Sequence, residues 1–472
     1  MSIRPLHRLA FVLVLCAAAA PAPAATRTVT SLDDAGAGTL RDALTSAQAG
    51  DEIVFAPALA GSIVLASTLT VPVPLSIHGS GSVALDGNDA VRVLSIPAGA
   101  RVLLDGLVIR RGFAADGGGI LSAGELVLVD CIVERNHASD RGGGLFQAAA
   151  PGSRYTIVDS TFADNGAVAE GGAIVDFSTA ASAIDSSRIT GNVTAGSGGG
   201  IRHVSGQALT IRNSTIAGNQ STGASSTTGG GIASQSSPLA IVASRVLNNK
   251  ATFAGGVYVA NLGTPASLQV VNSVIAGNTA TSDGGGVFVF GATATITSTT
   301  IANNAAVAAT SGGIGVQNSG AGTASLALLH ATVASNRSAA GAGGVTLISG
   351  TLSLRNTIVA NNAAPAHPDV LGAFTSLGYN LVQTRGTSTG YVATDLANGA
   401  NPSLAPLQFA GGATEVAPPG AASAARNAVA AASCVLARDQ RDYLRPAGAC
   451  DIGAMDVDAA STPDALFQGG FE

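Results

Sequence analysis

Residues 209–219, with the sequence LTIRNSTIAGN, are followed after a short loop by a glycine triplet at residues 229–231. This pair of phrases recurs nine times between about residue 117 and residue 362. Consecutive copies lie 26 to 32 residues apart. A repeat of this length and regularity is typical of a solenoid, in which each copy forms one coil and stacks on the next.

The aligned repeat contains columns that each hold one type of residue. An apolar residue stands three and eight positions before the end of the first phrase, and a small residue stands five positions before it in every copy. The apolar segments are short, β-branched and alternating, and glycines bound them, so we predict strands rather than helices. The phrase ends on an asparagine in every copy, namely Asn136, Asn165, Asn192, Asn219, Asn249, Asn278, Asn304, Asn336 and Asn362.

Coils that stack about 4.8 Å apart pair each strand with its copy above and below, which gives parallel sheets. The sequence therefore predicts an all-β fold, a right-handed parallel β-helix with a short N-terminal capping helix and an irregular C-terminal cap. The asparagine column suits a tight turn, because asparagine tolerates the left-handed conformation and its amide can bond the next asparagine. The composition agrees, since 61 glycines and no tryptophan fit a thin core.

The chain divides into five predicted segments. Residues 1–24 have early arginines, an apolar run and an Ala-Pro-Ala end, which is typical of a secretory signal peptide. Residues 25–112 are expected to form the N-terminal cap and the first irregular coils. Residues 113–362 form the regular β-helix, residues 363–458 a C-terminal cap or anchor-like module, and residues 459–472 a linker and tail.

The charge and the cysteines restrict the function further. The formal net charge of −6 moves to −8 when residues 1–24 are removed with their two arginines, so we do not expect a nucleic-acid partner. We expect no transmembrane segment in the mature chain, and we expect the chain to be a monomer.

In an exported protein Cys434 and Cys450 are expected to form a disulfide, because a metal pair would lack companion ligands. Cys131 falls in the small-residue column, and we expect a buried thiol.

Several segments resemble known families. Residues 171–174 (GGAI) and 162–165 (FADN) resemble the repeats of polymorphic outer-membrane proteins. Residues 38–44 are similar to the LREAI-type N-terminal motif of exported bacterial β-helix proteins. The DQR, RP and CDIGA motifs within residues 439–454 resemble a choice-of-anchor module, and residues 467–472 resemble a short tail of exported Gram-negative proteins. The resemblance implies a pectin-lyase-like fold that is secreted and lies outside the cell or on the outer-membrane surface.

The resemblance also implies where an enzyme of this fold would carry carboxylates, a basic residue and sometimes calcium, namely on one outer sheet. Asp116, Arg141 and Glu170 fall in one column, four residues before the apolar end of the glycine phrase. We favour a surface charge ladder in which Arg141 relieves the repulsion between the two acids. The alternative is a calcium or substrate site formed by Asp116 and Glu170. We expect no cofactor otherwise.

A second column would bring Asp176, His203 and Ser234 into one line, with Arg202 beside them. A nucleophile needs a base within hydrogen-bond reach, and the base needs an orienting acid, so these residues are catalytic candidates. However, the spacing between coils is longer than a hydrogen bond, and strand parity predicts that this column faces the core. We therefore favour a buried or half-buried polar cluster.

A third column contains Phe146, Tyr258 and Phe288, one residue after the apolar end of the glycine phrase. Outward-facing rings at these positions could stack on sugar rings, and the alternative is that they pack beneath loops.

The leading functional hypothesis is an exported, surface-associated and non-enzymatic rod that is adhesin-like, with a polysaccharide or another cell-surface molecule as its partner. The first alternative is a polysaccharide lyase or glycoside hydrolase that acts on an extracellular acidic polysaccharide. The second is an anchored passenger module whose loops bind a protein. The fold alone does not decide between them, because one fold hosts many functions.

Overall fold

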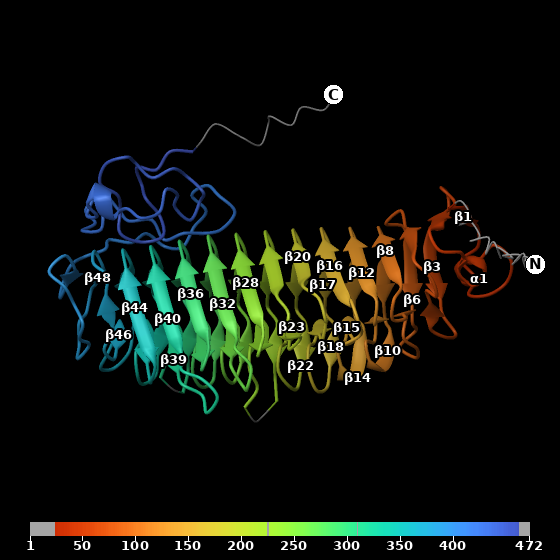
Figure 1. Cartoon of the computed structure of the whole chain (residues 1–472), viewed down its shortest axis with the longest axis horizontal. Helices are drawn as coiled ribbons and strands as arrows, with labels where there is room; N and C mark the ends of the chain where they lie inside the picture. The colour runs from red at the N-terminus through yellow and green to blue at the C-terminus, as the bar shows by residue number, and fades with distance from the viewer. Residues whose placement is uncertain (1–23, 224–225, 309, 462–472) are drawn as a thin grey trace, which may run out of the picture.

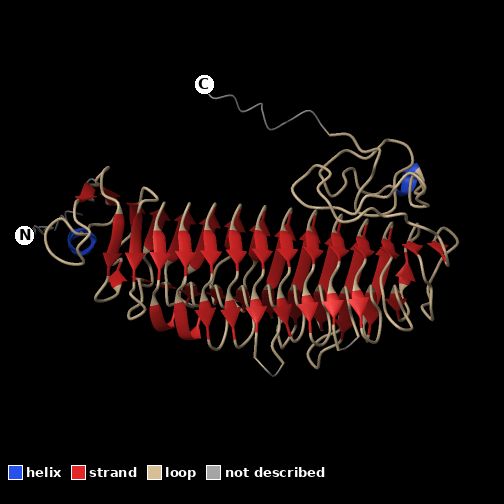
Figure 2. Cartoon of the chain, turned by 180° about the vertical axis from the view of Figure 1, so that it is seen from behind, coloured by secondary structure: helices blue, strands red, loops and turns tan. Residues whose placement is uncertain are grey.

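The computed structural model describes residues 24–223, 226–308 and 310–461, and they form a long rod of stacked coils (Figure 1). Figure 2 shows that strands make up the body and that the described helical turns lie near its two ends. The signal-peptide prediction falls outside the described residues except for Ala24, and the predicted tail at residues 467–472 also lies outside them.

Four parallel sheets run along the rod. Sheet A has 14 strands from β1 (Thr26–Val29) to β47 (Thr375–Ser376), and sheet B has 14 strands from β3 (Gly61–Val64) to β49 (Leu396–Ala397). Sheet D has nine strands from β10 (Phe113–Asp116) to β42 (Arg337–Ser338). Sheet C has 12 strands, namely β4 (Leu69–Thr70), β7 (Leu94–Ile96), β11 (Ile120–Ser122), β15 (Leu145–Gln147), β19 (Ile174–Asp176), β23 (Ile201–His203), β27 (Ile232–Gln235), β31 (Val257–Ala260), β35 (Val287–Phe290), β39 (Ile314–Gln317), β43 (Val345–Leu347) and β46 (Val370–Leu371).

One coil passes through the four sheets in the order C, A, B and D. The repeat at residues 209–219 supplies β24 (Leu209–Arg212) in sheet A and β25 (Thr215–Ala217) in sheet B, and β26 (Gln220–Ser221) follows in sheet D. The register of the strands reproduces the sequence alignment, since Ile211 pairs with Ile184 and Ile241. The predicted parallel β-helix with apolar residues stacked inside is therefore confirmed.

The asparagine column forms a buried ladder between the coils. The backbone N–H of Asn192 donates to Oδ1 of Asn219 at 3.0 Å, and Nδ2 of Asn192 donates to the same oxygen at 2.9 Å. The ladder continues with the same geometry from Asn136 to Asn362. The expected left-handed conformation at the asparagine itself is wrong, because the residue before it adopts the positive φ, as at Gly218 (67°). The asparagine amide instead bonds along the rod.

The small-residue column forms a second ladder at the turn between sheets A and B. The backbone N–H of Ser187 donates to Oγ of Ser214 at 3.0 Å, and the N–H of Ser214 donates to Oγ of Ser244 at 3.1 Å. Cys131 stands in the same column as a free and buried cysteine. Burial raises the pKa of its thiol to about 11, so the sulfur remains protonated.

A short helix begins the rod. Helix α1 (Leu40–Ser46) starts after Thr39, whose side-chain oxygen accepts a hydrogen bond from the backbone N–H of Asp42 at 3.2 Å. The Asp42 carboxylate in turn accepts from the N–H of Gly38 at 3.4 Å, which gives a weak reciprocal cap one residue beyond the usual position. Leu40 and Leu44 are buried in the hydrophobic core that runs through the coils.

The predicted C-terminal segment divides into two parts. Short strands from β46 (Val370–Leu371) to β49 (Leu396–Ala397) continue the coils. Residues 400–461, which we call the C-terminal module, then turn back and lie alongside the last coils (Figure 1). The module contains one 3₁₀ turn, η1 (Ala431–Ser433), among its described residues. It therefore covers the side of the rod rather than extending beyond its end.

The C-terminal module docks on the outer face of sheet B by polar and apolar contacts. Gln440 accepts a hydrogen bond from Thr300 Oγ1 at 2.6 Å, and a bidentate ion pair joins Arg245 to Glu415. A separate apolar cluster joins the two parts, and its fully buried members are Ile358, Ala360, Leu381, Ala425, Val429, Cys450 and Ile452. The module thus holds several coils together along the rod.

His330 lies buried beneath this junction. Its Nε2 is 2.8 Å from Nδ2 of Asn356, an amide that also donates to the carbonyl of Ser433 in the C-terminal module. Because Nδ2 is a donor, Nε2 must accept, so the ring is neutral. Burial, with Arg445 and Arg355 adding to it, lowers the pKa of His330 to about 2.

We predict that the substitution Asn219→Ala weakens the rod by about 3 kcal/mol. It removes the acceptor for both N–H groups of Asn192 and a donor to the carbonyl of Ile189, and each buried group left unpaired costs about 1–3 kcal/mol. The measurement is the midpoint of urea denaturation. Gln220→Ala, at the next and partly exposed position, is the matched control. Equal midpoints for the two variants would contradict the role of the ladder.

We predict that His330 makes the fold less stable below pH 6.5. The folded pKa is depressed, so its contribution is complete above the unfolded pKa and is lost as the pH falls from 6.5 towards about 2. At pH 5.5 the loss is about 1.4 kcal/mol. Comparing urea denaturation at pH 7.5 and 5.5 tests this, and His330→Gln should lose less stability between the two than wild type. The exposed His137→Gln is the control, and an unchanged pH dependence in His330→Gln would refute the prediction.

Candidate functional site

The outer face of sheet C brings Arg202 and the three predicted aromatic residues into one row. Each strand of this sheet points alternate side chains inward and outward. The first residue of each strand faces the core, so the second residue faces away from it. The register pairs Phe146 with Val175, Val175 with Arg202, and Tyr258 with Phe288. The predicted aromatic column and Arg202 therefore share one outer row, which also contains Ala233, Gly315 and Thr346.

An aromatic groove lies over part of this row. The rings of Tyr258 and Phe288 stack with their centroids 6.2 Å apart and an interplanar angle of 8°. Phe253 tilts against Phe288 at 6.2 Å, and Phe290 stacks on it at 6.3 Å. The groove has a volume of about 460 Å³, and its lining consists of Ser226, Thr228, Gln235, Phe253, Tyr258, Phe288, Phe290 and Gln317. We call this the sheet C groove.

The floor and the walls of the sheet C groove differ in exposure. Tyr258 is 7% exposed and Phe288 is 3% exposed, so these two rings form a packed floor. Phe253, Phe290 and Gln235 are partly exposed and form the walls. Burial raises the pKa of Tyr258 to about 12, so the hydroxyl stays protonated and can donate a hydrogen bond.

Gly315 shapes one side of the floor. A Cβ atom at this position would lie 2.5 Å from the ring of Phe288, so the ring leans over the glycine. Two of the three predicted aromatics, Tyr258 and Phe288, thus meet in one site. Phe253 and Phe290 were not singled out from the sequence. The alternation of β35 could have marked Phe290 as an outward residue, whereas Phe253 lies between β30 (Lys250–Ala251) and β31 and carries no such signal.

Phe146 belongs to a different site on the same row. It lies four strands before Tyr258, a distance of about 19 Å at 4.8 Å per coil. Its ring contacts Phe177 at 5.7 Å, and the guanidinium of Arg141 lies 4.8 Å from its centroid. Phe146 packs with Phe177 and Arg141 and is not among the residues that line the sheet C groove.

The column of Asp116, Arg141 and Glu170 forms a ladder of alternating charge. Arg141 donates two hydrogen bonds to Asp116 at 2.9 and 3.0 Å, and this pairing raises the pKa of the guanidinium. Arg202 donates from Nε to Glu170 at 3.0 Å. Each carboxylate therefore has its own arginine, which is the arrangement of a charge ladder.

The charge ladder does not fit a calcium ion. Calcium takes six to eight oxygen ligands, and two guanidinium groups beside the acids oppose a further cation. Among the residues that the structure describes, the acids that gather closely enough to share an ion are Asp451, Asp456 and Asp458, all in the C-terminal module. Asp116 and Glu170 are not part of such a group.

Asp176 and His203 meet inside the rod rather than on its surface. His203 Nδ1 lies 2.8 Å from Asp176 Oδ2, and both side chains are fully buried. The hydroxyl of Tyr155 lies 3.4 Å from the same oxygen, and Oγ of Ser178 donates to Oδ1 at 2.5 Å. The expectation that the spacing between coils would keep the side chains of Asp176 and His203 out of hydrogen-bond reach is therefore wrong, because these side chains lean towards each other across adjacent coils.

Ser234 does not join this pair. Its Oγ donates to the carbonyl of Ser237 at 3.3 Å, while His203 Nε2 contacts the carbonyl of Pro238 at 3.2 Å. The three residues are all fully buried, so a polymer cannot reach them. The geometry is that of a buried polar network, and Arg202, the fourth candidate of this line, faces the opposite side of the strand.

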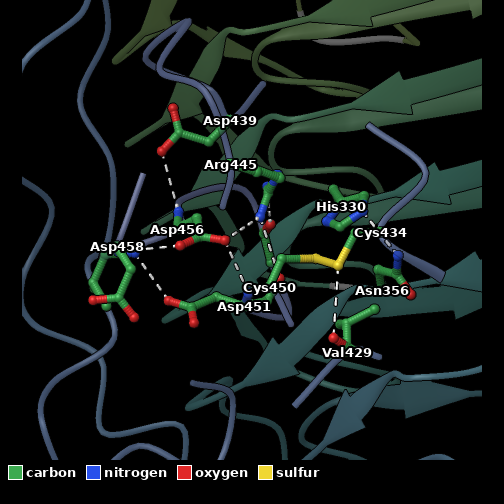
Figure 3. A network of polar contacts seen from close by, with 12 residues as sticks. His330, Asn356, Val429, Cys434, Asp439, Arg445, Cys450, Asp451, Asp456 and Asp458 are labelled. Carbon is green, nitrogen blue, oxygen red and sulfur yellow. Dashed lines mark hydrogen bonds and ion pairs between the residues drawn. A yellow bond between two sulfur atoms is a disulfide. The ribbon is translucent and has the colours of Figure 1, made fainter. Parts of the chain in front are cut away.

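The motifs that resemble an anchor module form a buried charge network (Figure 3). Arg441 donates two hydrogen bonds to Asp439 at 2.6 and 3.0 Å, and Arg445 lies 3.4 Å from Asp456. Burial lowers the pKa of Arg445 and raises that of Asp451. These motif residues hold the C-terminal module together from inside.

Cys434 and Cys450 form a disulfide within the same module (Figure 3). The bond closes a sequence separation of 16 residues, and the Cα atoms lie 6.1 Å apart. Cys450 is fully buried in the apolar cluster that joins the module to sheet B. The disulfide thus fixes the part of the module that contacts the rod.

No helix among the described residues is long and apolar enough to cross a membrane.

Comparison with known protein families supports the fold. A family model described as "Right handed beta helix region" matches residues 107–273, which agrees with the predicted right-handed coil. Among solved structures, the pectate lyase Pel9A is similar with a TM-score of 0.39 and 12% identity, over 91% of this chain and 96% of that chain. The A-module of a mannuronan C-5 epimerase from Azotobacter vinelandii is similar with a TM-score of 0.34 and 16% identity, over 78% and 96%. No curated protein matches the chain.

Proposed function

We propose that this chain is an exported, surface-associated β-helix protein that binds glycans in the sheet C groove without chemically altering them. The observation that carries the proposal is the cluster of Phe253, Tyr258, Phe288 and Phe290 around one open groove. Aromatic side chains present apolar rings, and the C–H face of a pyranose is also apolar, so the two surfaces fit together.

The groove also contains the polar groups that sugar recognition needs. Gln235 and Gln317 line it from opposite ends. The amide of Gln317 offers both donors and an acceptor, whereas the amide of Gln235, whose oxygen accepts from Arg202, offers its N–H donors. A sugar hydroxyl is likewise a donor and an acceptor, so these amides complement it. The combination of an apolar floor with a few placed polar groups is typical of a ligand site.

The rod favours binding because it holds the site rigidly. The groove residues lie on or beside strands β27, β31, β35 and β39, which are hydrogen-bonded in register on both sides. Sites on regular elements are more accurately held than sites on loops. The C-terminal module contacts sheet B, so the outer face of sheet C is available for a partner.

The proposed location rests on separate grounds. Residues 1–24 have the composition of a signal peptide. The disulfide between Cys434 and Cys450 is typical of an oxidising compartment. Attachment to the outer surface of a Gram-negative cell, with an adhesin-like role, is supported by the resemblance of the C-terminal motifs to an anchor module.

We predict that Phe253→Ala and Phe290→Ala each weaken glycan binding by a factor of about five to ten. Each substitution removes a partly exposed wall of the groove, and losing one stacked ring costs about 1–1.5 kcal/mol. A glycan array with the wild-type protein selects the ligand, and isothermal titration of that ligand measures the change. Phe113→Ala is the control, because Phe113 is an exposed aromatic residue on sheet D. Absence of any glycan ligand would exclude the proposal.

The alternative of a polysaccharide lyase or hydrolase is favoured by one observation. Asp116, Arg141, Glu170 and Arg202 converge along the corner between sheets C and D. Enzymes of this kind need a group that can accept or donate a proton near neutral pH. Each guanidinium group is instead ion-paired with one of these carboxylates.

We expect no unsaturated or shortened product when the protein is incubated with pectate or alginate, with or without calcium. The measurement is absorbance at 232 nm for lyase products, together with reducing ends for hydrolysis. Product formation that disappears in Glu170→Gln and persists in Asp159→Asn, a variant on the turn between sheets A and B, would establish the enzyme instead.

A further inference from the structure

Among the residues that the structure describes, no charged side chain lines the sheet C groove. The eight lining residues are four aromatics, two glutamines, one serine and one threonine. A carboxylate that leaves water for an apolar groove loses its hydration, and a site compensates for this loss with a cation or several N–H donors. The lining contains amide and hydroxyl donors and no cation, so it suits hydroxyl groups better than carboxylates.

Arg202, which lies next to the groove, already has hydrogen-bond partners in the protein. Arg202 contacts Gln235 through Nη2 at 2.5 Å and Glu170 through Nε at 3.0 Å. Its Nη1 has no partner among the described residues, yet this atom is enclosed and does not open into the groove. Arg202 therefore orients the amide of Gln235 and is not available to pair with an acidic sugar.

An acid beside the groove is hydrogen-bonded as well. Asp283 follows Phe253 in the same column of the repeat, its carbonyl accepts from the backbone N–H of Ala254, and its carboxylate accepts from the backbone N–H and the hydroxyl of Thr310. A fixed carboxylate at this edge repels a polyanion. The formal net charge of −6 acts in the same direction over longer distances.

We infer that the sheet C groove takes a short segment of a neutral, pyranose-based glycan and discriminates against polyuronates. This inference rests on the proposed function and specifies its ligand class. The groove spans the coils from Thr228 to Gln317, a length of about 14 Å at 4.8 Å per coil, so it accommodates a few sugar units rather than a long chain. Gln235 and Gln317 bond the hydroxyl groups, while the aromatic residues contact the C–H faces.

The test compares two panels of oligosaccharides by isothermal titration. One panel consists of neutral gluco-, manno-, xylo- and galacto-oligosaccharides, and the other consists of oligogalacturonates, oligomannuronates and oligoguluronates. We expect at least one neutral series to bind at least tenfold more tightly than every uronate. Tighter binding of a uronate would overturn the inference and leave glycan binding standing. Failure of both panels in the groove would overturn the proposed function as well.

Two variants separate recognition from folding. Gln317→Ala should weaken the neutral ligand about tenfold, whereas Gln220→Ala on sheet D should not. Gln317→Arg places a free cation in the groove and should increase uronate affinity at least fivefold at low salt, with the gain lost at high salt. Unchanged circular dichroism confirms that each variant is folded. If Gln317→Arg leaves the uronate affinity unchanged, the charge argument is wrong.

Discussion

The hydrogen bond from the backbone of each asparagine to the side chain of the asparagine in the next coil is the constraint on which the rod depends. It fixes the distance and the register of neighbouring coils at the turn between sheets B and D. The amide of Asn219 bonds both the next asparagine and the carbonyl of Ile189, so each buried polar group of the turn has a partner. With the register fixed, residues at equal positions of the repeat must form straight rows.

Those rows leave only a few positions of the repeat free for a binding role. The inward rows are filled by residues such as Ile211 and Ile216, and the turn rows by serine and asparagine. The outward row of sheet C is the place where the repeat varies, from Phe146 through Arg202 to Phe288. A substitution in this row leaves the two ladders intact, so the outward side chains can change from coil to coil without altering the register of the coils.

The sequence predicted what a periodic pattern encodes and missed what depends on contacts outside the period. The columns, the parallel pairing and the proximity of Asp176 to His203 follow from aligning copies, because one period equals one coil. The docking of the C-terminal module does not follow, since Arg245 and Glu415 are 170 residues apart and carry no shared pattern. The left-handed residue was misplaced by one position, because asparagine satisfies two roles and the repeat uses only its amide.

The sheet C groove could be predicted only in part from the repeat. Tyr258 and Phe288 shared a column and could be grouped from the sequence, but Phe253 and Phe290 stand at other positions of their coils. Whether a charged side chain is available to a ligand also could not be predicted from the repeat. Arg202 looked available in the sequence, and only its contacts with Glu170 and Gln235 show that it is engaged. Because a paired guanidinium cannot also neutralise a ligand, these two contacts decide the chemistry of the groove more than the arginine itself does.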